Sequence, residues 1–251
     1  MSHARPVDNA IYDQLGSRWY DAEDDPVALL RAEARHRNPW VAERLEHLLG
    51  PGPRRVLDVG CGAGFLANAL ALRGHAVTGL DAAPDSLRVA AQHDATGRVS
   101  YVHGDAFALP HADGHFDAVC AMDFLEHVEA PERTIAEAAR VLAPGGLYFF
   151  HTFDRSWLSW LLVIKGVEWL VPNTPRDMHV LHLFLRPAEL RHMCAAHGLE
   201  VLEVRGSRPR FDRAALRALV TRRIGDDFRF VATRSTALGY TGVARKRGTR
   251  P

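Results

Sequence analysis

Three residues with metal-binding or proton-transferring side chains lie close together in the middle of the chain. Asp123, Glu126 and His127 follow an apolar run and have the spacing D-x-x-E-H. Side chains three and four positions apart share one face of a helix, so a helix here would let the three converge on one point. Two carboxylates and an imidazole could hold a divalent ion, which lowers the pKa of a bound hydroxyl. The alternative is a helix start, where acidic side chains are favourable without any metal.

A glycine-rich turn is the second feature with chemical potential. An apolar run over 56–59 leads into Gly60-Cys61-Gly62-Ala63-Gly64, and a second apolar run ends at Asp81. This order predicts a strand, a turn that lets a ligand approach the backbone, a helix, and a second strand whose acid faces ribose hydroxyls. The spacing differs from the G-x-G-x-x-G of dinucleotide dehydrogenases, and Asp58 would repel a pyrophosphate. A nicotinamide cofactor is therefore disfavoured.

The elements that must position these groups alternate along the chain. Strands are expected at 56–59, 76–80, 98–105, 116–122, 147–150, 200–205 and 238–245, with helices at 66–72, 84–92 and 131–142 between the first five. Alternating strands and helices predict an α/β fold with a mostly parallel sheet and right-handed crossovers. Residues 9–50, before the first strand, show helical spacing of their apolar positions.

Composition limits the classes of function. The chain has 251 residues, of which 47% are hydrophobic, and this suffices for one domain with a sizeable core. A formal net charge of +1 gives no drive toward nucleic acid, so none is expected as a partner. Three widely spaced cysteines match no metal or disulfide pattern, and the polar stretch Ser2–Asn9 is no signal peptide. A cytoplasmic protein is expected.

The segment after the fifth expected strand is rich in tryptophan. The run 157–171 holds three of them, but it is shorter than the roughly 20 residues that a spanning helix needs. Lys165 and Glu168 also interrupt it, so a transmembrane helix is rejected. Tryptophans near its edges suit either a membrane interface or an apolar substrate mouth. A helix buried beneath a loop is an equally good alternative.

Seven arginines occupy a late stretch with helical spacing: Arg205, Arg208, Arg210, Arg213, Arg217, Arg222 and Arg223. A solvated face is the expected explanation. Anionic lipid headgroups would also suit these side chains.

The sequence around the glycine turn resembles the first motif of class I S-adenosylmethionine-dependent methyltransferases. Leu57-Asp58-Val59-Gly60-Cys61-Gly62-Ala63-Gly64 carries the resemblance, and Asp81, Asp105-Ala106 and Pro144-Gly145-Gly146 fall at the superfamily's later motifs. The resemblance covers about residues 54–150. It implies a Rossmann-like sheet of seven strands, mostly parallel with an antiparallel last strand, helices on both faces, and S-adenosylmethionine as the cofactor.

The same resemblance implies a cofactor site at the ends of the first four expected strands: Asp58, Gly60, Cys61, Gly62, Asp81, Ala82, Asp105, Ala106 and Met122. Asp81 would accept hydrogen bonds from the ribose, Asp105 and Ala106 would border the adenine, and Met122 would lie beside the sulfonium. A helix cap is the simpler explanation for Asp105, and core packing is the simpler one for Met122.

A narrower resemblance, to the ubiquinone-biosynthesis O-methyltransferase family, is carried by several short motifs: Ser17–Asp21, Asn38-Pro39, Met122–Val128, Ser156–Leu158, Val171-Pro172, His179 and Phe184–Leu190. That family methylates hydroxyls of polyprenylated phenols and catechols and associates with membranes through the region after strand five. The resemblance thus implies a lipophilic phenolic substrate, peripheral membrane contact through 157–171, and Mg²⁺ at Asp123, Glu126 and His127. Two departures are that Val41 replaces a frequent arginine and that His151 replaces a small hydroxyl residue.

Methylation of a phenol, whose pKa is about 10, also requires a group that removes its proton. His151 ends the fifth expected strand, where α/β sheets place ligands, and His127 and His179 are further candidates. His179 is favoured by its match to the family pattern.

The expected organisation is a single domain with an N-terminal helical lid (1–53), a cofactor-binding core (54–150), a substrate and membrane insertion (151–186) and a C-terminal completion of the sheet (187–251). Two alternatives stay open. One is a natural-product O- or N-methyltransferase on the same scaffold, and the other is a cofactor-binding association module without catalysis.

Overall fold

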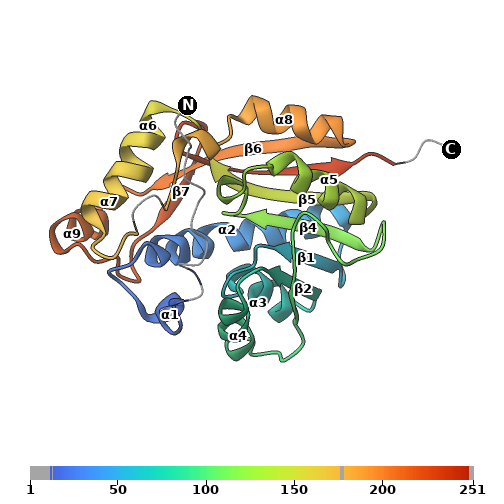
Figure 1. Ribbon diagram of the computed structural model, residues 1–251, viewed down its shortest axis with the longest axis horizontal. Coiled ribbons are helices and arrows are strands. Elements are labelled where there is room, and N and C mark those ends of the chain that lie inside the picture. The colour runs from blue at the N-terminus through green and yellow to red at the C-terminus, as the bar shows by residue number, and fades with distance from the viewer. Residues whose placement is uncertain (1–11, 13, 176–177, 249–251) are drawn as a thin grey trace.

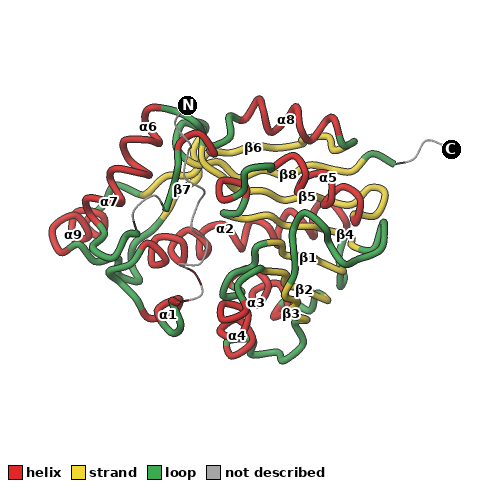
Figure 2. The backbone as a smooth tube through the Cα atoms, viewed as in Figure 1, coloured by secondary structure: helices red, strands yellow, loops and turns green. Residues whose placement is uncertain are grey.

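A computed structural model describes Tyr12, residues 14–175 and residues 178–248. The N-terminal stretch Ser2–Asn9 and the last residues of the expected C-terminal segment lie outside this part of the chain. The described residues form an eight-stranded sheet with helices around it (Figures 1 and 2). In chain order the strands are β1 Arg55–Val59, β2 Ala76–Asp81, β3 Ser100–His103, β4 Phe116–Met122, β5 Leu142–Phe153, β6 Leu199–Pro209, β7 Phe230–Thr233 and β8 Gly239–Lys246.

The helices include nine α-helical segments among the described residues: α1 Arg18–Asp21, α2 Pro26–Leu49, α3 Phe65–Leu72, α4 Pro84–Gln92, α5 Pro131–Val141, α6 Trp157–Ser159, α7 Gly166–Leu170, α8 Pro187–Ala196 and α9 Arg213–Thr221. Three further turns are the 3₁₀ helices η2 (Leu125–His127) and η4 (Leu181–Leu183) and the π-helix η3 (Trp160–Lys165). Proline begins α2, α4, α5 and α8, where its missing N–H costs nothing.

The strand order is β3-β2-β1-β4-β5-β8-β6-β7. Strands β1 to β5 pair in parallel, and β8 lies antiparallel to both β5 and β6. The predicted Rossmann-like sheet, mostly parallel with an antiparallel last strand, is confirmed. The structure adds a short eighth strand, because β7 pairs antiparallel with the end of β6.

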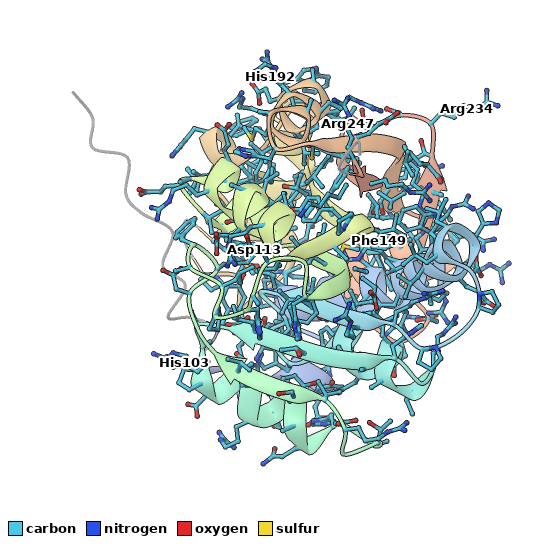
Figure 3. All side chains as sticks on the ribbon, turned by 90° about the vertical axis from the view of Figure 1, so that its right-hand side faces the viewer. His103, Asp113, Phe149, His192, Arg234 and Arg247 are labelled. Carbon is cyan, nitrogen blue, oxygen red and sulfur yellow. The ribbon has the colours of Figure 1, made fainter. Side chains whose placement is uncertain are left out.

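Two hydrophobic cores lie on the two faces of the sheet. On one face Trp40 and Leu45 of α2 pack with Leu70 of α3 against inward residues of the strands. On the other face Ile135 of α5 and Leu190 of α8 belong to the second core. The largest side chains of the central strand β5 are fully buried, and Phe149 lies inside the molecule in Figure 3. Because β1, β2, β4 and β5 run parallel to one another, their carboxyl ends lie at one edge of the sheet.

The tryptophan-rich segment is helical from Trp157 to Leu170, through α6, η3 and α7. Trp157 is 73% exposed and Trp169 is 62% exposed. The alternative of a helix buried beneath a loop is therefore wrong. In the described part of the chain, no helix combines the length and the apolar character that crossing a bilayer requires.

Candidate functional site

Three glycines of the turn after β1 adopt left-handed backbone conformations. Gly60, Gly62 and Gly64 have φ angles of 68°, 50° and 79°, which residues with a side chain rarely adopt. Gly64 is also the N-cap of α3. The amide of Gly60 donates to the carbonyl of Leu80 at 2.8 Å. The turn therefore joins the ends of β1 and β2 and delivers the chain into α3.

Asp81 lies at the carboxyl end of β2 and faces the glycine turn. Its Oδ2 accepts a hydrogen bond from the amide of Gly62 at 2.8 Å, and its Oδ1 accepts one from the amide of Ala83 at 2.9 Å. These bonds orient a carboxylate that has capacity for about four donors. Its orientation and its place after β2 suit it to receive ribose hydroxyls.

Aromatic side chains cover the same turn. A Cβ atom at Gly60 would lie 2.2 Å from the ring of Phe124, and one at Gly62 would lie 3.2 Å from the ring of Trp19. Trp19 is 3% exposed and stacks on Tyr12 with ring centroids 5.7 Å apart. The N-terminal segment that contains α1 therefore lies directly over the predicted cofactor site.

Asp58 is buried on β1, with 3% of its surface exposed. Burial raises the pKa of its carboxyl to about 7, although the Arg37 guanidinium and a hydrogen bond from the Ala67 amide favour the charged form. That amide belongs to the first turn of α3, where a carboxylate is favourable. Asp58 thus fastens α3 to β1, and a direct contact with the cofactor stays a prediction.

The remaining predicted cofactor residues make local contacts. Asp105 is exposed, and its Oδ1 accepts a hydrogen bond from the amide of Phe107 at 2.8 Å, as a turn cap would. Met122 is 7% exposed and belongs to the core beneath α2. Cys61 and Ala106 are buried, whereas Ala82 is exposed on the loop after β2. For these positions the contacts with cofactor stay predictions.

Asp123, directly after β4, has a left-handed backbone with φ 53°. Its Oδ2 lies 2.5 Å from the Arg37 guanidinium of α2, and the two side chains are 11% and 4% exposed. The only helical turn that follows at once is the 3₁₀ helix Leu125–His127. The prediction that Asp123, Glu126 and His127 share one face of a helix is therefore wrong, because the chain turns sharply at Asp123.

His151 of β5 is fully buried beside this ion pair. Its Nδ1 lies 2.7 Å from the hydroxyl of Thr241, and its Nε2 lies 3.4 Å from Asp123 and 3.5 Å from Glu33. The hydroxyl of Ser207 donates to Glu33 at 2.5 Å. Burial lowers the pKa of the His151 imidazole, although both carboxylates oppose the shift. His151 is thus enclosed in a buried polar network, and its role as a base stays a prediction.

Glu33, Asp123 and His151 offer three ligand atoms within 4.8 Å of one another. The guanidinium of Arg37 already neutralises Asp123 there. Glu33, Asp123 and His151 therefore form a buried polar network with Arg37.

Glu126 is fully buried, and hydrogen bonds from its own backbone amide and from the Thr152 hydroxyl favour the charged form of its carboxyl. Burial, and then the charge of Asp123, raises its pKa to about 8. Burial lowers the pKa of the neighbouring His127 to about 4, so its imidazole is neutral at pH 7. The hydroxyl of Tyr12 lies 3.5 Å from His127 Nε2. A neutral imidazole and a buried carboxyl group therefore lie side by side in the chain.

His179 lies next to His127, with ring centroids 5.4 Å apart. Aromatic rings of Phe153 and Phe184 flank it, at 5.4 Å and 6.0 Å. Burial lowers its pKa to about 3, so its imidazole is also neutral at pH 7. The structure thus brings two of the three predicted histidines together, and Phe153, which contacts His179, also contacts the ring of His151 at 5.8 Å.

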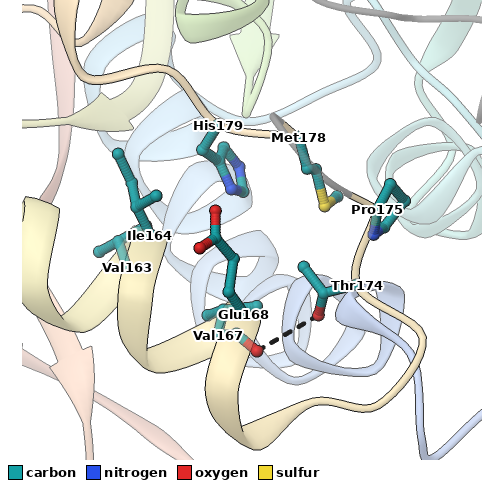
Figure 4. Close-up of a pocket in the computed structure, with 8 residues that line it drawn as sticks. All are labelled: Val163, Ile164, Val167, Glu168, Thr174, Pro175, Met178 and His179. Carbon is teal, nitrogen blue, oxygen red and sulfur yellow. Dashed lines mark hydrogen bonds between the residues drawn. The ribbon is translucent and has the colours of Figure 1, made fainter.

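A small pocket adjoins His179 and is lined by the tryptophan-rich segment and the loop that follows it: Val163, Ile164, Val167, Glu168, Thr174, Pro175, Met178 and His179. Figure 4 shows the carboxyl group of Glu168 pointing toward the His179 ring. Apart from Glu168, Thr174 and His179, the lining is apolar. The segment 157–170 therefore exposes its tryptophans on one side and adjoins His179 on another.

Sequence reasoning did not identify Glu33 as part of the site. It lies in a helix whose charged residues alternate with apolar ones, so only its low exposed fraction of 5% distinguishes it. Arg37 pairs with Asp123 across 86 positions of sequence, a contact that has no local signal. Phe124 was visible only as part of a family motif.

Similarity to known proteins identifies the class to which the chain belongs. Residues 57–150 match the methyltransferase domain family. The fold resembles that of a SAM-dependent methyltransferase from Methanosarcina mazei (TM-score 0.59, 21% identity, 84% of this chain and 98% of that one). It also resembles one from Thermotoga maritima (TM-score 0.59, 18% identity, 92% and 94%). With the glycine turn and Asp81 in place, the protein is a class I S-adenosylmethionine-dependent methyltransferase.

Curated relatives narrow the family. The chain is 36% identical over 208 residues to the ubiquinone biosynthesis O-methyltransferase of Aromatoleum aromaticum, covering 81% of this chain and 86% of the relative. It is 37% identical over 210 residues to that of Thiobacillus denitrificans, covering 82% and 88%. The chain belongs to the ubiquinone biosynthesis O-methyltransferase family, and it is an O-methyltransferase.

Proposed function

We propose that the protein methylates a phenolic or catecholic hydroxyl on a lipophilic, polyprenylated quinone precursor. The observation that carries the proposal is the small pocket that the Trp157–Leu170 segment and the loop after it line together with His179. A long apolar tail would lie along that segment while the phenol ring approaches the histidines. The names of the curated relatives support a substrate of ubiquinone biosynthesis.

Methyl transfer from a sulfonium is an in-line displacement, so most of the catalysis is alignment of the two reactants. Asp81 would hold the ribose, and the glycine turn would lie against the amino-acid part of the cofactor. Trp19, on the N-terminal lid, would cover the bound cofactor and exclude water. His179 or His127 would be the proton acceptor. Both imidazoles are neutral at pH 7, but burial also makes them weak bases, so the phenol itself would have to be acidified for the transfer.

The residues around η2 fit a divalent ion such as Mg²⁺. The carboxyl group of Glu126 is buried close to that of Asp123, whose charge raises its pKa, and the neutral His127 can act as a ligand. Asp123 would complete the set, although Arg37 and His151 already contact its carboxylate. Such an ion would lower the pKa of the substrate hydroxyl.

The exposed tryptophans of 157–171 would place this segment at the cytoplasmic face of the membrane, where a polyprenylated substrate resides. Trp157, Trp160 and Trp169 are 73%, 43% and 62% exposed. Amphipathic rings of this kind favour the level of the lipid headgroups. The contact would be peripheral.

The test is methylation of a panel of catechols with labelled S-adenosylmethionine. We expect a polyprenylated catechol to be methylated with a lower KM than the same catechol without its tail. EDTA should suppress the reaction and Mg²⁺ should restore it. His179→Asn should lower kcat and leave the affinity for S-adenosylmethionine unchanged.

Transfer to an amine, with no methylation of any catechol, would contradict the proposed substrate and favour the natural-product alternative. Full activity in EDTA would remove the metal and leave the two histidines as proton acceptors.

A further inference from the structure

Helix α9 packs in the reverse of the usual orientation for a surface helix. It buries the small residues Ala214 and Ala218, and Ala218 belongs to a hydrophobic cluster with Ala28 and Ala32 of α2. Its large apolar residues point outward instead, and Leu216, Leu219 and Val220 are 63%, 52% and 77% exposed. A helix of a soluble protein normally buries its large apolar side chains, since burial of each contributes to stability.

The residue that leads into α9 extends the same apolar surface. Phe211 is 79% exposed, and the guanidinium of Arg208 lies 5.2 Å from the centre of its ring. Asp212, between Phe211 and the helix, accepts hydrogen bonds from the first amides of α9 and so starts the helix. Four large apolar side chains are therefore held at the surface by a well-capped helix.

Positive charge surrounds these side chains. Residues 208–223 contain six arginines and one acidic residue, a net charge of +5 in a chain whose total is +1. Arg217 pairs with Asp227, and Arg223 pairs with Glu23 at 3.0 Å. Within the described part of the chain, Arg208, Arg213 and Arg222 form no ion pair. We call Phe211, Leu216, Leu219 and Val220, with these three arginines, the α9 surface.

The α9 surface is continuous with the exposed tryptophan segment. The Arg222 guanidinium donates to the carbonyl of Trp169 at 3.0 Å, which ties the end of α9 to α7. Figure 1 shows α9 and α7 side by side at the left end of the molecule, beyond the β7 edge of the sheet. Both elements expose large apolar side chains, and neither is covered by another described segment.

We infer that the α9 surface docks on an anionic phospholipid bilayer. The apolar side chains would enter the headgroup region, and arginine side chains can lie along apolar surface while their charges reach lipid phosphates. A second copy of the chain fits less well, because a two-fold contact would set each cluster of arginines against the same cluster of its partner. The inference extends the membrane contact proposed for 157–171 to a different element, and it rests on that proposal only for the presence of a bilayer near the substrate.

Vesicle co-sedimentation tests the inference with the full chain. We expect the wild type to sediment with vesicles of phosphatidylcholine and phosphatidylglycerol, to bind phosphatidylcholine alone much less, and to be released by high salt. Arg213→Gln should weaken binding about fivefold, the effect of one surface arginine. Leu219→Glu combined with Val220→Glu should weaken it further.

Matched controls lie near the opposite edge of the sheet. Leu72→Glu alters a leucine of α3 that is 65% exposed, and Arg98→Gln alters an exposed arginine before β3, the opposite edge from β7. Both controls should bind vesicles as the wild type does. Melting by circular dichroism establishes that every variant is folded.

Wild-type binding by both α9 variants would overturn the inference, as would a wild type that binds no anionic vesicle. A dimer in sedimentation velocity that the Leu219 and Val220 changes abolish would show that a second copy covers the surface, and would also overturn it. Methylation of a catechol without a tail is measured in parallel. It should be unchanged in the α9 variants, so a failed inference is distinguishable from a failed function.

Discussion

The buried carboxyl of Glu126 predicts that stability depends steeply on pH and that a substitution of Glu126 removes this dependence. Its pKa is about 8 in the folded protein, against 4.5 as the ordinary value for glutamate. Between these values the folded protein retains a proton that the unfolded chain releases. Stability is therefore complete below pH 4.5 and is lost as the pH rises toward 8. At 1.36 kcal/mol per pH unit, the loss between pH 5 and pH 8 is about 4 kcal/mol.

Glu126→Gln keeps the shape of the side chain and cannot ionise. We expect its free energy of unfolding, measured by urea titration in EDTA, to exceed that of the wild type increasingly from pH 5 to pH 8, by about 4 kcal/mol over the range. Glu129→Gln, which alters an exposed residue three positions away, is the matched control and should follow the wild type. A difference between Glu126→Gln and the wild type that stays constant over this range would refute the reasoning.

Added Mg²⁺ sharpens the same experiment. A divalent ion binds the carboxylate form, so it should flatten the pH dependence of the wild type and leave Glu126→Gln unchanged. An identical effect of Mg²⁺ on both proteins would contradict Glu126 as a ligand, whatever the assays of methylation give.

Two further predictions concern the cofactor turn and the buried ion pair. Asp81→Ala removes a carboxylate that is oriented by the amides of Gly62 and Ala83. We expect calorimetry to show that S-adenosylmethionine binds about tenfold more weakly or worse, because a charge-assisted hydrogen bond is lost. Unchanged affinity in a folded variant would contradict the ribose assignment. Arg37→Met leaves Asp123 buried without its partner and should lower the free energy of unfolding by about 3–5 kcal/mol in urea titration. Adding Asp123→Asn to Arg37→Met should restore part of that loss, and a double variant that is less stable than Arg37→Met would be evidence against the pair.

Most of the sheet could be predicted because its signals are local. The strands at 56–59, 76–80 and 116–122 are short apolar runs between turn residues, and each lies within one residue of its observed bounds. The strand β7 could not be predicted in this way. It has four residues, Phe230–Thr233, and exists because it pairs with the end of β6 more than twenty positions earlier.

The same difference between local and long-range signals applies to the candidate site. The glycine turn and Asp81 are adjacent to their own strands, so motif and spacing identify both. The surroundings of Asp123 depend on side chains from α2 and β5, which sequence cannot bring together. The predicted helix failed at this point because Asp123 adopts a left-handed backbone, a conformation that tertiary contacts with Arg37 can hold but that sequence does not signal.

The departures from the family pattern converge on one carboxylate. The arginine frequent after Asn-Pro is absent, since Val41 stands there, and Arg37 lies on the other side of the Asn-Pro pair. His151 replaces a small hydroxyl residue. In the structure Arg37 binds one oxygen of Asp123 and His151 approaches the other. Asp123 is therefore held between side chains of α2 and β5, and the three residues form one packed unit.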